Sequence, residues 1–229
     1  MAKLVWDAVG DRLFEGGVKN GVLFTQNTDG TYNKGVAWNG LTGVTEKPDG
    51  AEPNAMYADD IKYAAPRSKE EFKATIEAYT YPDEFAPCCG ETEIAEGVTI
   101  GQQKHQAFGL CYRTAIGNDT EDFSHGYKLH IVYGATAAPV EKSYETINEN
   151  PEAITFSWDI ETIPVEVTGC EPTAIVTINS LTADETKLAA LEAMLYGTDA
   201  EGGNAGTDPT LPLPDTIKTM MSTTTTTTP

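Results

Sequence analysis

Basic residues are scarce in this chain of 229 residues, because 15 Lys and Arg stand against 35 Asp and Glu. The formal net charge at pH 7 is therefore -20, and the isoelectric point is about 4.3. Sequence-independent binding to nucleic acids depends on Lys and Arg side chains that displace counterions from phosphates. The composition therefore argues against a nucleic-acid-binding protein.

Long apolar runs are absent as well. No stretch approaches the roughly 20 apolar residues that a membrane-spanning helix needs. The N-terminal segment MAKLVWDAVGDRLF lacks the apolar core of a signal peptide. We therefore expect no membrane association, and we expect synthesis and folding in the cytosol.

Cysteine and histidine are few, which limits disulfide and metal chemistry. The four cysteines are Cys88, Cys89, Cys111 and Cys170. Adjacent cysteines cannot easily bond each other, and a chain of this size does not need bridges, so reduced thiols are expected. Zinc held by these thiols with His105, His125 or His130 is the alternative, but no pair has the spacing of a zinc knuckle.

Catalytic motifs are also missing. The chain has no nucleophile elbow, P-loop, dinucleotide-binding fingerprint or zinc-protease motif. Asp122, Ser124 and His125 are near neighbours in an acidic segment, where side chains point in different directions and do not form a triad. A pair such as Glu161 and Glu166 is expected by chance among so many carboxylates. The sequence therefore predicts no catalytic residue, no cofactor site and no metal site, and hence a protein that is not an enzyme.

Alternation of apolar and polar residues predicts half-buried β-strands through most of the chain. Four segments show it most clearly, and their apolar faces carry Phe72, Ala74, Ile76 and Ala78; Phe108, Leu110, Tyr112 and Ile116; Tyr127, Leu129, Ile131 and Tyr133; and Ile154, Phe156, Trp158 and Ile160. Further strands are expected at 18–25, 32–45, 164–169 and 174–180.

The segments between these strands are acidic or rich in turn residues. Residues 27–30 predict a polar turn, because Asp29-Gly30 favours positive backbone dihedral angles. Residues 46–54, EKPDGAEPN, combine two prolines with a glycine and three acids, which predicts a mobile excursion. Residues 117–126, GNDTEDFSHG, predict a ten-residue loop that projects from the sheet edge, too long for a tight hairpin turn.

One α-helix is expected at about 182–197. Thr182 and Glu185 have the spacing of a capping box, Gly197 suits a left-handed cap, and Leu188, Leu191 and Leu195 form an apolar stripe that should pack on a sheet. The fold class is therefore mainly β, a β-sandwich or partial barrel with one flanking helix. We expect a β domain with its helix at 1–198, and at 199–229 an acidic linker, a short extended or helical arm and a disordered Thr-rich tail.

Several segments, in the same order along residues 3–213, resemble the major tail proteins of long, non-contractile-tailed bacteriophages of Gram-positive hosts. They are KLVWDAVGDRLFEGGVKNGVLF, GVAWNGLTGVTEKPDGAEP, ATIEAYTYPDEF, GVTIGQQ, YRTAIGNDT and GYKLHIVYGATAAPVEKSYETINENPEAITFSWD.

The resemblance implies a structural virion protein, made in the host cytoplasm, that polymerises into stacked hexameric rings. These rings form the tail tube, the conduit for genome delivery. Implied partners are further copies of the chain, the tape-measure protein, the tail terminator and distal tail proteins, with DNA passing through the lumen unbound. The loop at 46–54 would reach the neighbouring ring, or is an ordinary solvated loop. Polar faces such as Thr155, Asp159 and Glu161 would line an anionic lumen, or simply meet bulk water.

A different class of function is a β-sandwich module that binds carbohydrate or attaches to a surface. Its support is the aromatic content, including Trp6, Trp38 and Trp158, because sugars stack on exposed rings. The place of Trp158 on an apolar strand face argues for the core instead. A glycoside hydrolase would need two carboxylates on rigid strands that face one cleft.

Overall fold

The computed structural model describes residues 3–139, 141–144, 146, 153–200 and 205–222. The elements in chain order are β1 (Phe14–Thr25), β2 (Val36–Trp38), β3 (Leu41–Glu46), β4 (Asp49–Gly50), β5 (Met56–Ala58), β6 (Ile61–Ala64), β7 (Glu70–Glu71), β8 (Lys73–Ala78), the 3-10 helix η1 (Asp83–Cys89), β9 (Thr92–Ala95), β10 (Val98–Ile100), β11 (Phe108–Asn118), β12 (Asp122–Ala137), β13 (Phe156–Thr162), β14 (Ile175–Asn179), α1 (Glu185–Tyr196) and α2 (Pro214–Ser222). The fold is mainly β, as predicted.

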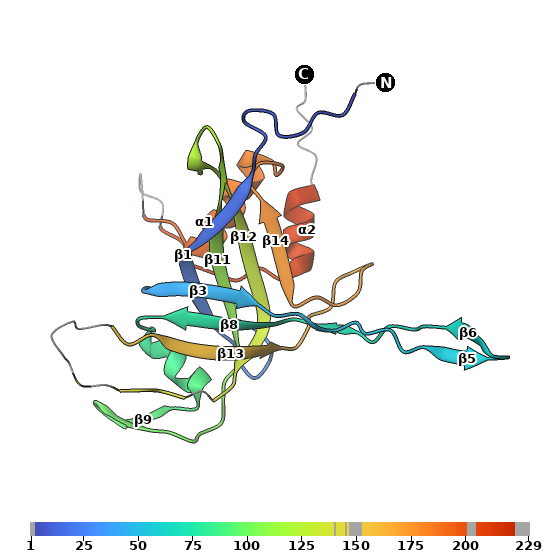
Figure 1. Cartoon of the computed structure of the whole chain (residues 1–229). Coiled ribbons are helices and arrows are strands. Elements are labelled where there is room, and N and C mark those ends of the chain that lie inside the picture. The colour runs from blue at the N-terminus through green and yellow to red at the C-terminus, as the bar shows by residue number, and fades with distance from the viewer. Residues whose placement is uncertain (1–2, 140, 145, 147–152, 201–204, 223–229) are drawn as a thin grey trace.

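One antiparallel sheet in the order β2-β1-β11-β12-β13-β8-β3 makes the body. The middle of β12, from Lys128 to Val132, also pairs with β14, and its last residues pair with β13. Strand β12 changes from one partner strand to the other near Gly134. The φ of Gly134 is 58°, and its backbone lies so close to the Ile163 carbonyl that a side chain would not fit. Strands β1, β11, β12 and β14 therefore cross β3, β8 and β13 (Figure 1). Among the described residues the path ends at β2 and β3, so the sheet is not a closed barrel.

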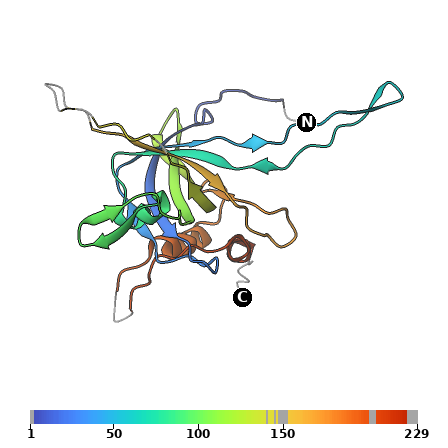
Figure 2. The ribbon, with the colours of Figure 1, turned by 90° about the horizontal axis from the view of Figure 1, so that it is seen from below.

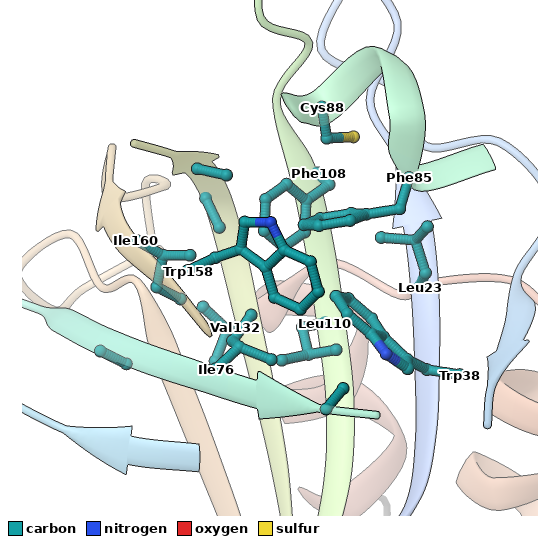
Figure 3. Packing of buried hydrophobic residues seen from close by; sticks show 14 of the residues in the cluster. Leu23, Trp38, Ile76, Phe85, Cys88, Phe108, Leu110, Val132, Trp158 and Ile160 are labelled. Atoms are coloured by element: carbon teal, nitrogen blue, oxygen red, sulfur yellow. The ribbon is translucent and has the colours of Figure 1, made fainter. Parts of the chain in front are cut away.

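The inner core fills the space between these two layers and is built around Trp158. Its ring lies 5.8 Å from Trp38 and 5.2 Å from Phe85, centroid to centroid, and Phe85 lies 5.2 Å from Phe108 (Figure 3). Such edge-to-face pairs add stability beyond the area they bury. Because Phe85 comes from η1, this short helix closes one end of the core.

The predicted apolar faces of the four clearest strands are largely confirmed. In β8 and β13, Ala74, Ile76, Ala78, Trp158 and Ile160 are buried. At the start of the last segment, Ile154 is exposed and lies before β13. Of the further strands, 174–180 becomes β14, but 164–169 contributes only an isolated bridge between Val165 and Thr173.

The expectation of half-buried strands is wrong for β11 and β12. Phe108 and Leu110 face the inner core, whereas Cys111, Leu129 and Ile131 belong to a second core under the helices. These central strands are buried on both faces because helices α1 and α2 cover the side that faces away from β3, β8 and β13 (Figure 2). In α1 the predicted stripe of Leu188, Leu191 and Leu195 is buried in this second core.

The C-terminal segment contributes to the same core. Leu211 and Ile217 are buried there, and α2 forms in the segment for which an extended or helical arm is expected. The Thr-rich tail at 223–229 and linker residues 201–204 lie outside the described residues. The boundary between 198 and 199 stays a prediction.

The N-terminus of α1 differs from the predicted capping box. Asp184, not Thr182, is the N-cap, and its carboxylate accepts a hydrogen bond of 3.0 Å from the Lys187 backbone N–H. At the other end, Gly197 has the expected positive φ of 74°, but its ψ of 176° is not left-handed helical. The two short residues Thr182 and Asp184 both suit a cap, so their types alone do not decide between them.

Asp184→Ala is expected to lower the free energy of unfolding by about 1 kcal/mol, because an orphan N–H of the first turn loses its acceptor. Thr182→Ala is the matched control and should change the free energy of unfolding by only a few tenths of a kcal/mol. Urea unfolding of both variants measures the difference. A larger loss at Thr182 would show that the capping box forms after all.

The prediction of a ten-residue loop at 117–126 is wrong. Strands β11 and β12 continue through it as a tight hairpin, with Asn118 opposite Asp122. The Asn118 side-chain carbonyl accepts hydrogen bonds from the backbone N–H groups of Thr120 at 3.1 Å and Glu121 at 2.6 Å. These bonds hold the turn, and the acidic side chains project into solvent from paired strands.

Candidate functional site: a projecting hairpin arm

A long two-stranded arm leaves the body between β3 and β8 and carries no core of its own (Figures 1 and 2). The antiparallel pairing of β3 with β8 continues along it through β4 with β7, a bridge from Pro53 to Arg67, and β5 with β6. Bonds such as Lys47 N–H to the Lys73 carbonyl, 2.7 Å, join these sections. We call residues 47–72 the arm.

Nearly all of the excursion predicted at 46–54 lies in the arm, where it begins the outgoing side of the hairpin. The returning segment of the arm, at 61–72, was not predicted from the sequence. A signal was present, because Met56, Tyr57, Ile61 and Tyr63 flank the turn-forming pair Asp59-Asp60. Both aspartates have positive φ, 51° and 61°, as a tight two-residue hairpin turn requires.

The far end of the arm exposes apolar side chains. Met56, Tyr57, Ile61 and Tyr63 are between 53% and 75% exposed. We call these four residues with Asp59 and Asp60 the arm tip. An isolated two-stranded hairpin is at best marginally stable in water, and clustered exposed apolar residues mark interaction surfaces. The arm tip is therefore a candidate interaction surface.

Charged residues fix the arm to the body at its base. Lys73 Nζ donates to Asp49 Oδ2 at 2.9 Å and lies 3.7 Å from Glu71 and 3.8 Å from Glu161. The hydrogen bond with Lys73 lowers the pKa of Asp49, and the hydrogen bond with Asp49 raises the pKa of Lys73. The stability that the Asp49 carboxylate contributes is therefore lost only as the pH falls through its lowered pKa. The stability that the Lys73 ammonium contributes is lost only as the pH rises through its raised pKa. Both groups are charged throughout the neutral range.

Lys73→Gln is expected to loosen the arm without unfolding the body, because this partly exposed lysine contacts both strands of the arm and β13. Backbone amides at 49–71 should exchange with solvent faster, while the global free energy of unfolding stays close to that of the parent chain. Hydrogen exchange followed by mass spectrometry measures this. Lys62→Gln, which removes a cation from the other end of the arm, is the control. Equal exchange in both variants would contradict a role for Lys73.

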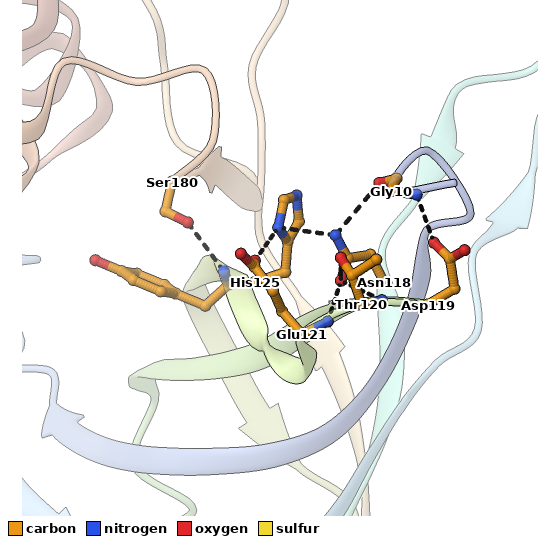
Figure 4. A network of polar contacts seen from close by, with 8 residues as sticks. Gly10, Asn118, Asp119, Thr120, Glu121, His125 and Ser180 are labelled. Carbon is orange, nitrogen blue, oxygen red and sulfur yellow. Dashed lines mark hydrogen bonds and ion pairs between the residues drawn. The ribbon is translucent and has the colours of Figure 1, made fainter. Parts of the chain in front are cut away.

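A second exposed apolar segment lies at the N-terminus. Leu4, Val5, Trp6 and Val9 are among the most exposed large side chains of the described residues. The segment is attached to the β11–β12 hairpin, because Gly10 N–H donates to Asp119 Oδ1 at 2.9 Å and Asn118 Nδ2 donates to the Gly10 carbonyl at 3.3 Å (Figure 4). Arg12 lies 3.6 Å from Asp119.

The residues considered for catalysis or metal binding do not converge. His125 Nδ1 lies 2.7 Å from Glu121 Oε2 within the hairpin turn, and His130 stacks on Tyr112 at 4.7 Å. Burial lowers the pKa of His130. The structure groups no three His, Cys, Asp or Glu side chains into a metal-binding cluster within its described ranges.

The four cysteines are free, and Cys88 and Cys111 are buried. Burial raises the pKa of each of these two thiols to about 12, so both stay protonated near neutral pH. A protonated thiol is a poor nucleophile and a poor metal ligand.

The polar face of β13 lies close to the base of the arm. Asp159 and Glu161 are exposed there, and Asp159 accepts a hydrogen bond of 2.5 Å from the Thr75 hydroxyl. Two of the three tryptophans, Trp38 and Trp158, are buried, so neither offers a stacking surface for sugars. Trp6 is exposed.

No protein-family model matches the chain, and no curated protein matches it. Among solved structures, the chain is similar to the sheath/tube terminator of an extracellular contractile injection system in its extended state. The identity is 10% and the TM-score is 0.31, over 77% of this chain and 99% of that chain. A similarity this weak carries no argument about function. None of the described helices is long and apolar enough to cross a membrane.

Proposed function

We propose that the chain is a structural subunit of a phage tail tube, in which copies assemble into stacked hexameric rings that carry the genome to the host. The observation that supports this most is the arm, because a projecting hairpin with an apolar tip fits a contact between copies of the chain. In the family that the sequence resembles, a loop at this position reaches the neighbouring ring.

Open sheet edges support the same proposal. Strands β2 and β3 end the path of the main sheet, and an open edge presents unpaired backbone groups that can accept a further strand. Pairing between neighbouring copies would extend the sheet around a ring and remove these edges. The net charge of -20 fits a conduit whose wall does not retain DNA.

The proposal assigns the chain no reaction and no cofactor. Its partners would be further copies, the tape-measure protein that the lumen holds during assembly, the tail terminator and distal tail proteins. The location would be the virion.

Negative-stain electron microscopy of the concentrated protein tests the proposal, with hollow tubes or rings of uniform width as the expected result. Binding to a glycan array by a protein that remains monomeric in the presence of a tail initiator complex would overturn it. That outcome would favour the carbohydrate-binding alternative, in which exposed rings such as Trp6, Tyr57 and Tyr63 would stack on sugars.

A further inference from the structure

The chain contains two Asn-Gly pairs, Asn20-Gly21 and Asn39-Gly40. In such a pair the asparagine side chain can react with the backbone nitrogen of the next residue, because glycine has no side chain that shields this nitrogen. The two pairs have the same local sequence chemistry but lie in different surroundings. The structure therefore decides which of them can react.

Asn39 and Gly40 form the turn between β2 and β3, the two strands that end the path of the main sheet. Both residues are exposed, and Gly40 has a positive φ of 75°, which suits a central position of a tight turn. Within the described residues, no hydrogen bond engages the Asn39 side chain or the Gly40 N–H. The side-chain amide of Asn39 and the nitrogen of Gly40 are therefore free to approach each other.

The other pair is held inside a sheet. Asn20 is exposed, but Gly21 is buried in β1 and lies opposite Trp38 of β2. A side chain at Gly21 would meet Leu41 at 3.1 Å and the Trp38 Cβ at 3.2 Å, so the backbone is closely packed there. Reaction at Asn20 needs a rotation of this peptide, and the sheet must first open locally to permit it.

The turn at Asn39 is attached to the neighbouring chain on both of its sides. The Trp38 indole N–H donates to the Thr80 carbonyl at 3.0 Å, and the Tyr79 backbone N–H donates to the Gly40 carbonyl at 2.8 Å. An isoaspartyl residue between Trp38 and Gly40 lengthens the main chain between these two hydrogen bonds, so both cannot keep their geometry. Because Trp38 belongs to the inner core, the change reaches the packing of the core.

We propose that Asn39 is a site of spontaneous deamidation and that its isoaspartyl product loosens the turn that holds Trp38. The Gly40 nitrogen bonds to the side-chain carbonyl carbon of Asn39, and the amide group leaves as ammonia with the proton of the Gly40 N–H. Water then adds to either carbonyl of the resulting succinimide and opens the ring to aspartate or isoaspartate. The reaction needs only water, and it is independent of the proposed tube.

Peptide mapping by mass spectrometry tests the site in the folded protein after storage at mildly alkaline pH. Trypsin separates the two pairs, because it cuts after Lys19, Lys34 and Lys47. Asn39 should convert at least about tenfold faster than Asn20, whose reaction requires local opening of the sheet. In guanidinium chloride, where the sheet is unfolded, both sites should convert at similar rates. Equal rates in the folded protein, or faster conversion at Asn20, would overturn the proposal.

Thermal unfolding tests the effect on the turn. Once Asn39 has been converted, the melting temperature should be about 2–4 °C lower, the shift for roughly one lost hydrogen bond in a chain of this length. Asn39→Gln forms the cyclic intermediate far more slowly and should keep its melting temperature through the same storage. Freshly prepared Asn39→Asp has the new charge without the longer main chain, and it should melt like the parent chain.

These variants should fold, because Asn39 is exposed and its side chain makes no hydrogen bond among the described residues. An equal fall in stored Asn39→Gln would show that another position causes the loss and would overturn the proposal. A converted parent chain that melts like the fresh one would overturn it as well.

Discussion

A chain with Tyr57→Ser and Tyr63→Ser is expected to remain monomeric at concentrations at which the parent chain forms tubes. Both rings stand at the arm tip and are more than 70% exposed in the single chain. If a neighbouring copy covers them, each substitution removes about 2 kcal/mol of the free energy gained by burying apolar surface. Together they should raise the critical concentration about 10³-fold.

The fold itself should be unaffected by this change. Surface substitutions away from core contacts usually alter the free energy of unfolding by about 0.5 kcal/mol or less. Sedimentation velocity and electron microscopy measure assembly, and thermal unfolding checks the fold. The matched control is Tyr57→Phe with Tyr63→Phe, which keeps both rings and should still form tubes. Tubes of normal length from the serine variant would show that the arm tip is not an assembly contact.

Glu192→Gln is expected to produce the largest loss of stability from a single polar side chain, about 3–5 kcal/mol. Glu192, from α1, forms an ion pair with Arg113 of β11 and accepts a hydrogen bond of 2.6 Å from the Tyr127 hydroxyl. The Arg113 guanidinium lies 4.3 Å from the Tyr127 ring centre and 5.1 Å from that of Tyr196, and its side chain is 16% exposed. Without Glu192 this charge stays among aromatic rings with no counterion.

The double variant Arg113→Met with Glu192→Met gives the comparison. It removes both charges and keeps apolar volume, so it should be much closer to the parent than Glu192→Gln is. Urea unfolding of the single and double variants measures the coupling between the two positions. A loss below about 1 kcal/mol in Glu192→Gln would mean that water screens the pair.

The strands and their inner core could be predicted because their signal is local. Alternation over a few residues is enough to place Ile76, Trp158 and Ile160 on an apolar face, and all three are buried. The apolar stripe of α1 was predictable for the same reason. The sequence could not decide whether Thr182 or Asp184 is the N-cap of α1, because both residue types accept the same hydrogen bond.

The wrongly predicted segments are those that pair with strands distant in the sequence, or whose charged side chains face solvent. Residues 46–54 have the composition of a mobile loop, and only pairing with residues 66–74 makes them one strand of the arm. Residues 117–126 are acidic, yet the Asn118 side chain closes them into a tight hairpin. The second face of β11 became buried only because α1 and α2 fold over it, which alternation within the strand does not reveal.

The pairing of β1 with β11 has a consequence for how the chain folds. Phe14 lies opposite Gly117, so β1 waits until β11 has been synthesised for its principal neighbour, and β8 likewise waits for β13. Contacts this distant along the sequence slow folding, because chain entropy is lost before the contacts form. The nascent chain therefore spends much of its synthesis with unpaired strands, and the sheet is complete only after β14 has left the ribosome.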